Sequence, residues 1–299
     1  MNSLKKVFQQ LEKGKKAIGH FNVSNLETFE AAVMASKKTK TPIIIGASEG
    51  AIKHAGLDFF IWAKEYFQEK YATQIFIHID HGKDLDLLES AIRKGFDSVM
   101  IDASAEKFQQ NVYLTKYIVK IARKYGVWVE SEIGSVGGAE EKNNNRGLIY
   151  TDPIQAEEFV KKTACNSLAV SIGTSHGAYK FKGESRLNFQ ILKQIKNLVD
   201  IPLVLHGASG VSGEVTRGLK KIGINLGRTS GVSDANIKEA IKLGIRKVNI
   251  DTDLQLAMFL QLVKEVKKGD ETKLYKILNN VAEAMGEEVI GKIKLFSGR

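Results

Sequence analysis

The sequence is poor in cysteine and proline, and it contains no long hydrophobic run. The single cysteine, Cys165, excludes an intramolecular disulfide and fits a reducing compartment. No apolar segment approaches the roughly 20 residues that a membrane-spanning helix needs. The basic N-terminus lacks the apolar stretch of a secretory signal. With 43% hydrophobic residues and only three prolines, the composition is globular. We therefore expect a cytoplasmic protein with no membrane partner.

Positive charge exceeds negative charge, giving a net charge of +10. The lysines occur as scattered pairs with acidic residues between them, and no recognition motif or interleaved aromatic residues accompany them. A solvated basic surface that attracts anionic metabolites is therefore favoured over a nucleic-acid interface. A non-catalytic protein that binds RNA or another polyanion remains the alternative from a different functional class.

Eight short apolar runs alternate with stretches of helical spacing. Runs such as Ile43–Ile45 are apolar without alternation, which is typical of strands buried on both faces of a parallel sheet. Alternation of strands and helices at this length favours a closed (β/α)8 TIM barrel over an open sheet. We predict one α/β domain over residues 1–299, with strands at 17–23, 42–47, 74–80, 98–102, 127–133, 167–172, 202–205 and 247–251.

Two connections are longer than the others. Residues 134–150 form a polar loop rich in glycine and asparagine, and residues 209–238 form an extended connection expected to hold an extra helix. Both follow predicted strands, on the face where barrels carry their active sites. Long loops in compact domains are often binding loops or lids, so we expect 134–150 to be mobile.

Unusual polar residues gather at the C-terminal ends of the predicted strands. His81, His176 and His206 follow the third, sixth and seventh strands, and carboxylates end the third to fifth strands nearby. In a closed barrel these ends converge, and three imidazoles with an open position form a common catalytic site for a divalent metal. We interpret His20 and His54 as structural residues and expect His78 to point away from the pocket.

Glycines beside these histidines predict a phosphate site. Gly177, Gly207 and Gly210 allow backbone N–H groups to approach a ligand closely. Barrel enzymes often bind phosphate with the loops after strands seven and eight. Here those loops carry Ser209 and Thr252, and Lys180 can reach in from the loop after strand six.

Several motifs together resemble class II fructose-1,6-bisphosphate aldolases, in the branch that includes tagatose-bisphosphate aldolases. The resemblance covers essentially the whole chain. Its most specific parts are His78-Ile-Asp-His-Gly82, Ser98-Val-Met-Ile-Asp-Ala-Ser104, Gly137-Gly-Ala-Glu140, Leu203-Val-Leu-His-Gly-Ala-Ser-Gly210 and Asn249-Ile-Asp-Thr252.

The resemblance implies a role for each matching residue. His81, His176 and His206 would bind the catalytic metal, zinc or another divalent ion such as cobalt. Asp102 and Glu132 would line a neighbouring, more buried metal position. Asp80 would handle the proton of the C4 hydroxyl, Glu140 the proton at C3 of dihydroxyacetone phosphate, and Asn249 would help hold the enediolate. The first phosphate would be bound by Gly177, Lys180, Gly207, Ser209, Asp251 and Thr252, near a monovalent cation (Na⁺ or K⁺) in some members, and the far end of the substrate by Asn22 and Ser48.

The chemistry of cleavage agrees with a metal. Breaking the C3–C4 bond of a ketose bisphosphate leaves negative charge that a divalent cation can stabilise as a Lewis acid. The other route is a Schiff base on a lysine, but no predicted strand ends in a lysine directed at the pocket. Lys180 lies past strand six among the phosphate-site residues.

The resemblance has departures. Ala139 stands where many members carry a polar residue, and Gln255 where a number of fructose-specific members carry an arginine. Tagatose 1,6-bisphosphate therefore stays open as the alternative to fructose 1,6-bisphosphate. The resemblance also implies triose phosphate products, a place in glycolysis and gluconeogenesis, and a homodimer or homotetramer.

Overall fold

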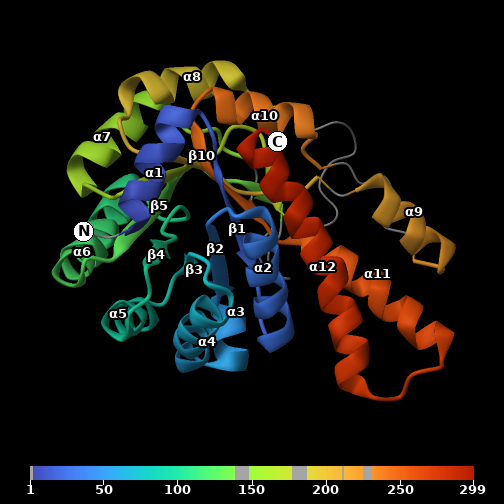
Figure 1. Ribbon diagram of the computed structural model, residues 1–299. Coiled ribbons are helices and arrows are strands. Elements are labelled where there is room, and N and C mark those ends of the chain that lie inside the picture. The colour runs from blue at the N-terminus through green and yellow to red at the C-terminus, as the bar shows by residue number, and fades with distance from the viewer. Residues whose placement is uncertain (1–2, 139–147, 177–186, 211, 225–230) are drawn as a thin grey trace.

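The computed structural model describes residues 3–138, 148–176, 187–210, 212–224 and 231–299. Eight parallel strands close into a barrel in the order β1-β10-β9-β7-β5-β4-β3-β2, and helices surround it (Figure 1). The predicted (β/α)8 TIM barrel is confirmed. The eight strands all belong to one closed sheet, so the described residues share a single barrel.

The barrel strands lie where the apolar runs predicted them, with ends that differ by about two residues or fewer. Their bounds are β1 Ile18–Asn22, β2 Ile43–Ser48, β3 Ile75–Gly82, β4 Ser98–Ile101, β5 Trp128–Ile133, β7 Ser167–Val170, β9 Leu203–Leu205 and β10 Ile245–Ile250. Two further short strands, β6 Gly137–Gly138 and β8 Ser175–His176, pair with each other beyond the C-terminal ends of β5 and β7.

Local sequence signals set the helix ends. Asp152 caps α7 by accepting the backbone N–H of Gln155, with Pro153 in the first turn, and Gly95 ends α5 in the left-handed conformation. The extended connection after β9 contains the expected extra helix, α9. The helices are α1 Ser3–Gly14, α2 Leu26–Thr39, α3 Glu49–Ala55, α4 Leu57–Tyr71, α5 Leu85–Lys94, α6 Phe108–Tyr125, α7 Pro153–Thr163, α8 Phe189–Leu198, α9 Gly213–Lys221, α10 Asp234–Lys242, α11 Thr252–Lys268 and α12 Leu274–Ser297.

The N-terminal end of the barrel is closed by apolar packing. Helix α1 places Leu4, Val7 and Phe8 against the first inward-facing residues of the strands, and Phe8 stacks on Trp128 with ring centroids 5.0 Å apart. Because side chains alternate along a strand, the residues two and four positions further on form higher layers inside the barrel. The members of the apolar layer from the strands are Ile18, Ile44, Phe76 and Trp128.

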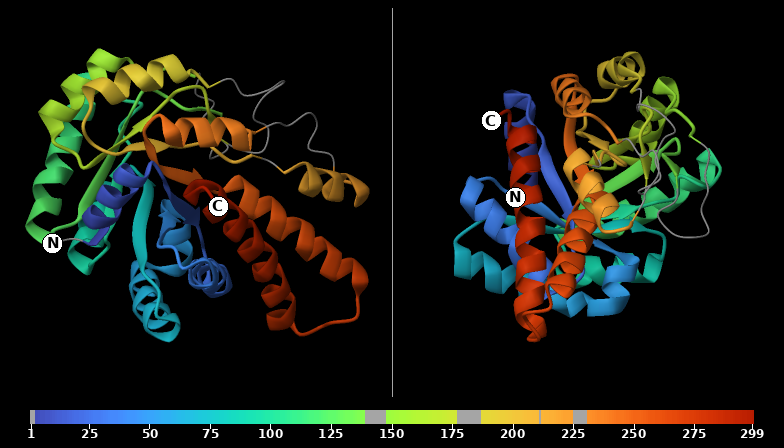
Figure 2. Two further views of the ribbon diagram at one scale, coloured as in Figure 1. Left: turned by 45° about the horizontal axis from the view of Figure 1, so that its top comes forward. Right: turned by 90° about the vertical axis from the view of Figure 1, so that its right-hand side faces the viewer.

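The last two helices form a hairpin whose tip projects from the barrel. Helices α11 and α12 lie side by side, and α12 also packs against α2 and β1 (Figures 1 and 2). Several large apolar side chains on this hairpin are exposed: Phe259, Val266, Leu274 and Tyr275. Among the described helices, none combines the length and the apolar character that a membrane span requires.

Candidate active site

The uppermost layer inside the barrel is built around the carboxylate of Asp80. The amide nitrogens of Asn22 on β1 and Asn249 on β10 each donate to one of its oxygens at 3.0 Å. The Asp80 residue is only 5% exposed. Two neutral donors hold the carboxylate in one orientation, and the oxygens of both amides lie buried beside it without a hydrogen-bond partner. Those two amide oxygens are thus available to a ligand.

His81 faces the same pocket as Asp80 although the two residues are adjacent on β3. Successive side chains of a regular strand point to opposite faces. Here the φ angle of His81 is +48°, and the pairing of β3 with β4 shifts register between Ile79 and Gly82. A non-glycine residue in the left-handed region is strained, and such strain concentrates at functional sites. This local distortion turns both side chains into the pocket.

The imidazoles of His81 and His206 meet at a very short distance. Nε2 of His81 lies 2.7 Å from Nδ1 of His206, and the rings are nearly perpendicular. One of these nitrogens must carry a hydrogen for the contact to exist, and a cation bound by both lone pairs would replace that hydrogen. Asp80, His81 and His206 each offer a ligand atom within 4.8 Å of the others. The two imidazoles of this group suit a divalent metal of the zinc type, with the Asp80 carboxylate beside it.

The opposite nitrogen of His81 faces two carboxylates. Nδ1 lies 3.1 Å from Asp102 and 3.9 Å from Glu132. Asp102 also accepts hydrogen bonds from the backbone and hydroxyl of Ser104. These three ligand-type residues, His81, Asp102 and Glu132, lie within 4.8 Å of one another. The structure thus brings Asp102 and Glu132 together beside His81, where the more buried metal position was expected.

Charge in the pocket is set by burial and hydrogen bonds. Burial alone would raise the pKa of Asp102, but the hydrogen bonds from His81 and Ser104 hold it well below its usual range. Burial lowers the pKa of His206, and the nearby His81 lowers it further. An ionised Asp102 and a neutral His206 are the forms that a cation site requires.

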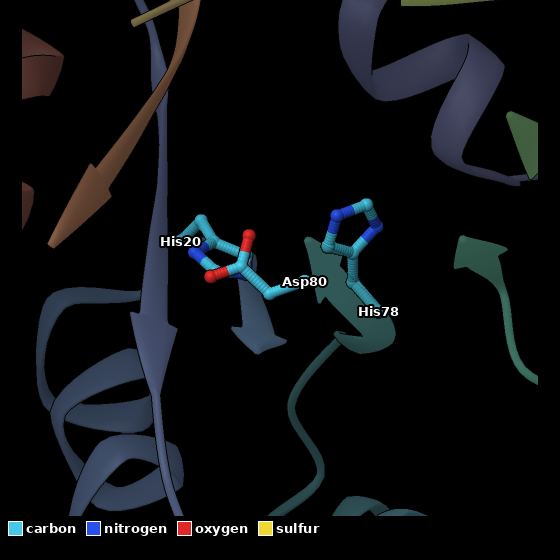
Figure 3. A group of neighbouring side chains, drawn as sticks. All are labelled: His20, His78 and Asp80. Atoms are coloured by element: carbon cyan, nitrogen blue, oxygen red, sulfur yellow. Dashed lines mark ion pairs between the residues drawn. The ribbon is translucent and has the colours of Figure 1, made fainter. Parts of the chain in front are cut away.

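A second polar layer lies directly below Asp80. His20 and His78 contact each other edge to face, and Nε2 of His20 lies 3.9 Å from Asp80 (Figure 3). The expectation that His78 points away from the pocket is therefore wrong. It lies two residues before Asp80 on β3, so both side chains face the barrel interior.

His20, His78 and Asp80 each offer a possible ligand atom within 4.8 Å of the others. This group nevertheless does not fit a metal. Nδ1 of His78 contacts the Ser98 hydroxyl at 2.7 Å, and Nε2 lies 3.3 Å from Nζ of Lys247. Burial and the charge of Lys247 lower the pKa of His78 to about 3, and burial with the same charge lowers the pKa of His20 well below its usual value. A cation there would face the Lys247 side chain, so both histidines are better described as neutral supports.

Two charged residues of the lower layer were not among the predicted site residues. Lys247 on β10 and Glu130 on β5 form an ion pair of 2.8 Å across the barrel, and each side chain is 1% exposed. Glu130 also contacts Nε2 of His206 at 2.9 Å. The sequence pattern could have placed both residues inside the barrel, because side chains two positions apart on a strand share a face. Lys247 lies two residues before Asn249, and Glu130 lies two before Glu132. Lys247 is enclosed below the pocket, so it does not restore the Schiff-base route.

The segment that follows β7, the sixth strand of the barrel, lies beside the loop that carries His206. Residues Ser175 and His176 form β8, and Gly207, with φ of +61°, lies so close to Ser175 that an added Cβ would come within 2.8 Å of its carbonyl oxygen. A side chain at position 207 is therefore excluded. The side chain of His176 lies outside the described atoms, so its role as third ligand stays a prediction.

The predicted phosphate loops are adjacent. The backbone N–H of Gly210 donates to Asp253 at 2.8 Å, which ties the loop carrying Ser209 to the start of α11. That helix begins at Thr252, next to the exposed Asp251, and helix N-termini favour anions. Ser48 caps α3 and pairs in register with Asp80. Glu140, Gly177 and Lys180 lie outside the described residues.

Comparison with known proteins identifies the family. Residues 2–299 match the family described as Fructose-bisphosphate aldolase class-II. The chain belongs to this family. It is 41% identical to the fructose-bisphosphate aldolase of Thermus caldophilus and 39% identical to that of Helicobacter pylori, in both cases over 93% of this chain and 92% of the relative. The crystal structure of the YdjI aldolase from Escherichia coli K12 superposes with a TM-score of 0.79 at 35% identity, covering 98% of this chain and 96% of that one.

Proposed function

We propose that this family member cleaves fructose 1,6-bisphosphate reversibly to dihydroxyacetone phosphate and glyceraldehyde 3-phosphate, with a bound divalent metal. The observation that carries the proposal is the contact of 2.7 Å between His81 and His206 beside the clamped carboxylate of Asp80. It combines a cation site with a fixed base in one pocket, as metal-dependent aldol cleavage requires.

The residues present give each part of the reaction a physical basis. Asp80 accepts the proton of the C4 hydroxyl as the C3–C4 bond breaks, and returns it in the direction of synthesis. Asn22 and Asn249 hold its two oxygens, so the carboxylate does not need to reorient. A bound metal would supply Lewis-acid stabilisation of the negative charge that develops on the ketose oxygens. Glu140 remains the predicted acid/base at C3.

We propose zinc as the metal, held by His81, His206 and, as the sequence predicts, His176. Neutral imidazoles and an open coordination position suit zinc, and cobalt binds the same ligand types. The carboxylates of Asp102 and Glu132 offer the neighbouring position on the other side of His81. A monovalent cation near the first phosphate stays a prediction from the resemblance.

Fructose 1,6-bisphosphate is the favoured substrate. The names of the relatives from Thermus caldophilus and Helicobacter pylori favour it over tagatose 1,6-bisphosphate, which Gln255 had left open. In the structure Gln255 donates to Asp251 at 3.2 Å. We propose that Gly207, Ser209, Asp251 and Thr252, with the predicted Gly177 and Lys180, bind the first phosphate, and that Asn22 and Ser48 lie toward the far end of the sugar.

Cleavage of fructose 1,6-bisphosphate tests the proposal directly. Triose phosphate release should be lost after EDTA treatment and dialysis, and should return when zinc is added. Tagatose 1,6-bisphosphate, assayed in parallel, should give a lower kcat/KM. Activity that survives EDTA and dialysis would contradict a metal-dependent aldolase, and cleavage of neither sugar in any metal state would overturn the proposed reaction.

We also propose that the chain assembles as a homodimer or homotetramer. The exposed apolar side chains on the α11–α12 hairpin, among them Phe259 and Leu274, offer a surface for a second copy. Sedimentation at micromolar concentration should give the mass of a dimer or larger, and a monomer would contradict this. The cytoplasmic location and the place in glycolysis and gluconeogenesis stay predictions.

A further inference from the structure

The buried ion pair between Glu130 and Lys247 is an energetically unfavourable way to fill the middle of a barrel. Such interiors are usually packed with branched apolar side chains. Removing two charges from water costs several kcal/mol per ion in real proteins, and an apolar pair of similar volume is often as stable or more stable. The pair therefore needs an explanation other than stability.

The two oxygens of Glu130 have different partners. Oε2 contacts Nζ of Lys247 at 2.8 Å, and Oε1 contacts Nε2 of His206 at 2.9 Å. A carboxylate only accepts hydrogen bonds, so the contact with Oε1 places the hydrogen of His206 on Nε2. The lone pair of a neutral His206 is then on Nδ1, the nitrogen that faces His81. Glu130 thus determines which nitrogen of His206 is presented to the pocket.

Lys247 limits the freedom of Glu130. Its ammonium group lies between the carboxylate and Nε2 of His78, whose other nitrogen contacts Ser98. Because Lys247 holds one oxygen, rotation of the Glu130 carboxylate away from His206 would break the ion pair. A row of contacts therefore runs from Ser98 through His78, Lys247 and Glu130 to His206.

We propose that Glu130 is a positioning residue that fixes His206 in the Nδ1-coordinating form, and that Lys247 is the counter-charge that holds Glu130 in place. The inference rests on the proposed metal site, and it goes beyond it by assigning a task to the charged layer below. Carboxylates that orient a ligand histidine typically change metal affinity by about 10–100-fold when they are removed.

Two charge-neutral double variants separate this role from simple neutralisation of Lys247. Glu130→Leu with Lys247→Met removes the ion pair and also the carboxylate oxygen that accepts from Nε2 of His206. Glu130→Gln with Lys247→Met also removes the ion pair, but it keeps an amide oxygen that can accept from His206. The two variants have similar volume and equal charge, so they differ chiefly in the hydrogen bond to His206.

Zinc affinity, measured by competition with a chelator, is the main readout, with the melting temperature of the metal-free protein beside it. We expect the leucine variant to bind zinc about 10–100-fold more weakly than the unmodified protein. The glutamine variant should recover at least half of that loss on a logarithmic scale. The glutamine variant should melt close to the unmodified protein, because it contains no unpaired buried charge. The leucine variant should melt somewhat lower, because it also removes the acceptor of a buried N–H donor of His206. At saturating zinc, KM should change less than kcat.

Glu12→Gln serves as the matched control. It removes a carboxylate paired with Arg246, which neighbours Lys247 on β10, and it should leave zinc affinity unchanged. Equal zinc affinity in the two double variants would overturn the inference, as would unmodified affinity in the leucine variant. Failure to bind zinc at all in the unmodified protein would overturn it too. Zinc binding without cleavage of either sugar would contradict the proposed reaction and leave this inference intact.

Discussion

The two ends of the barrel interior are built on opposite principles although the same strands supply both. At the N-terminal end, residues such as Ile18 and Phe76 pack with α1 in an apolar layer. Four residues further along the same strands, Asn22 and Asp80 form the hydrogen-bonded floor of the pocket. Since α1 contributes to one end and loops to the other, stability and chemistry are spatially separated.

The second polar layer lies between these two ends, in the middle of the barrel, and resembles neither of them. It is as buried as the apolar layer, yet it carries His20, His78, Glu130 and Lys247. Its charges are internally paired, so the layer tolerates burial while its contacts reach upward to His206. The difference between the ends therefore predicts which substitutions affect activity, which affect stability, and which affect both.

Asp80→Asn should have the largest effect on activity. The amide cannot accept the C4 hydroxyl proton, and its NH2 group would face the donor amides of Asn22 or Asn249. We expect kcat to fall by about 10²–10⁴-fold, with zinc affinity changed by much less. Steady-state kinetics with zinc at saturation measure this, and exposed Asp86→Asn is the control. An unchanged kcat would mean that another group moves this proton.

Phe8→Ala should have the largest effect on stability alone. The Phe8 ring is buried and stacks on Trp128 at the closed end of the barrel. Its removal should cost about 3–5 kcal/mol of unfolding free energy, while kcat per folded molecule stays unchanged. Urea denaturation and kinetics on the folded fraction measure both quantities, with exposed Tyr113→Ala as the control. A parallel loss of kcat would contradict the separation of the two ends.

Gly46→Ala should damage both properties, because Gly46 lies beside the middle and upper layers. An added Cβ would lie 2.2 Å from Nε2 of His20 and 2.6 Å from Oδ1 of Asn22. Overpacking of this kind costs typically about 1–3 kcal/mol, and displacement of Asn22 should lower kcat. Thermal unfolding and kinetics test this.

Gly50→Ala is the matched control for Gly46→Ala, because a Cβ there meets only the Ser48 hydroxyl at 3.7 Å within helix α3. It should be neutral or slightly stabilising. If Gly46→Ala leaves both melting temperature and kcat unchanged, the two layers are not coupled as their contacts indicate.

Much of this arrangement could be predicted from the sequence. Buried parallel strands appear as apolar runs, and the polar residues that end them predict a shared pocket, where the structure brings Asp80, His81 and His206 together. The charged layer below does not follow from the sequence alone, because an inward Glu130 or Lys247 looks like a surface charge until strand register places it across the barrel. The period of two along β5 and β10 was the available signal.

Two features of the site had no sequence signal. The positive φ of His81 and the register shift beside it put adjacent side chains into one pocket, against the alternation that strand patterns assume. The contact of Asn22 with Asp80 depends on the exact register of β1 against its neighbours. Local distortion and long-range register result from the closed barrel, and propensities of single residues do not reveal them.

Glu12→Gln should have the smallest effect, and its pH dependence identifies the cause. Glu12 on α1 pairs with Arg246 at 2.8 Å and with Lys196 at 3.2 Å. Burial raises the pKa of Glu12, but these two cations lower it more, so its folded value lies below its usual one. A lowered folded pKa stabilises the protein above the unfolded pKa of about 4.3, and this stabilisation is lost as pH falls through the folded value.

At pH 7 the free energy of unfolding of the variant should therefore be lower by less than about 1 kcal/mol, because the pair is partly exposed. This difference should shrink below about pH 4. Urea denaturation at pH 7 and at pH 3 measures it. Glu287→Gln, which removes an exposed pair with Lys38 at 3.5 Å, is the control and should change nothing. A difference that persists unchanged at pH 3 would show that Glu12 joins α1 to the barrel by the packing of its side chain rather than by its charge.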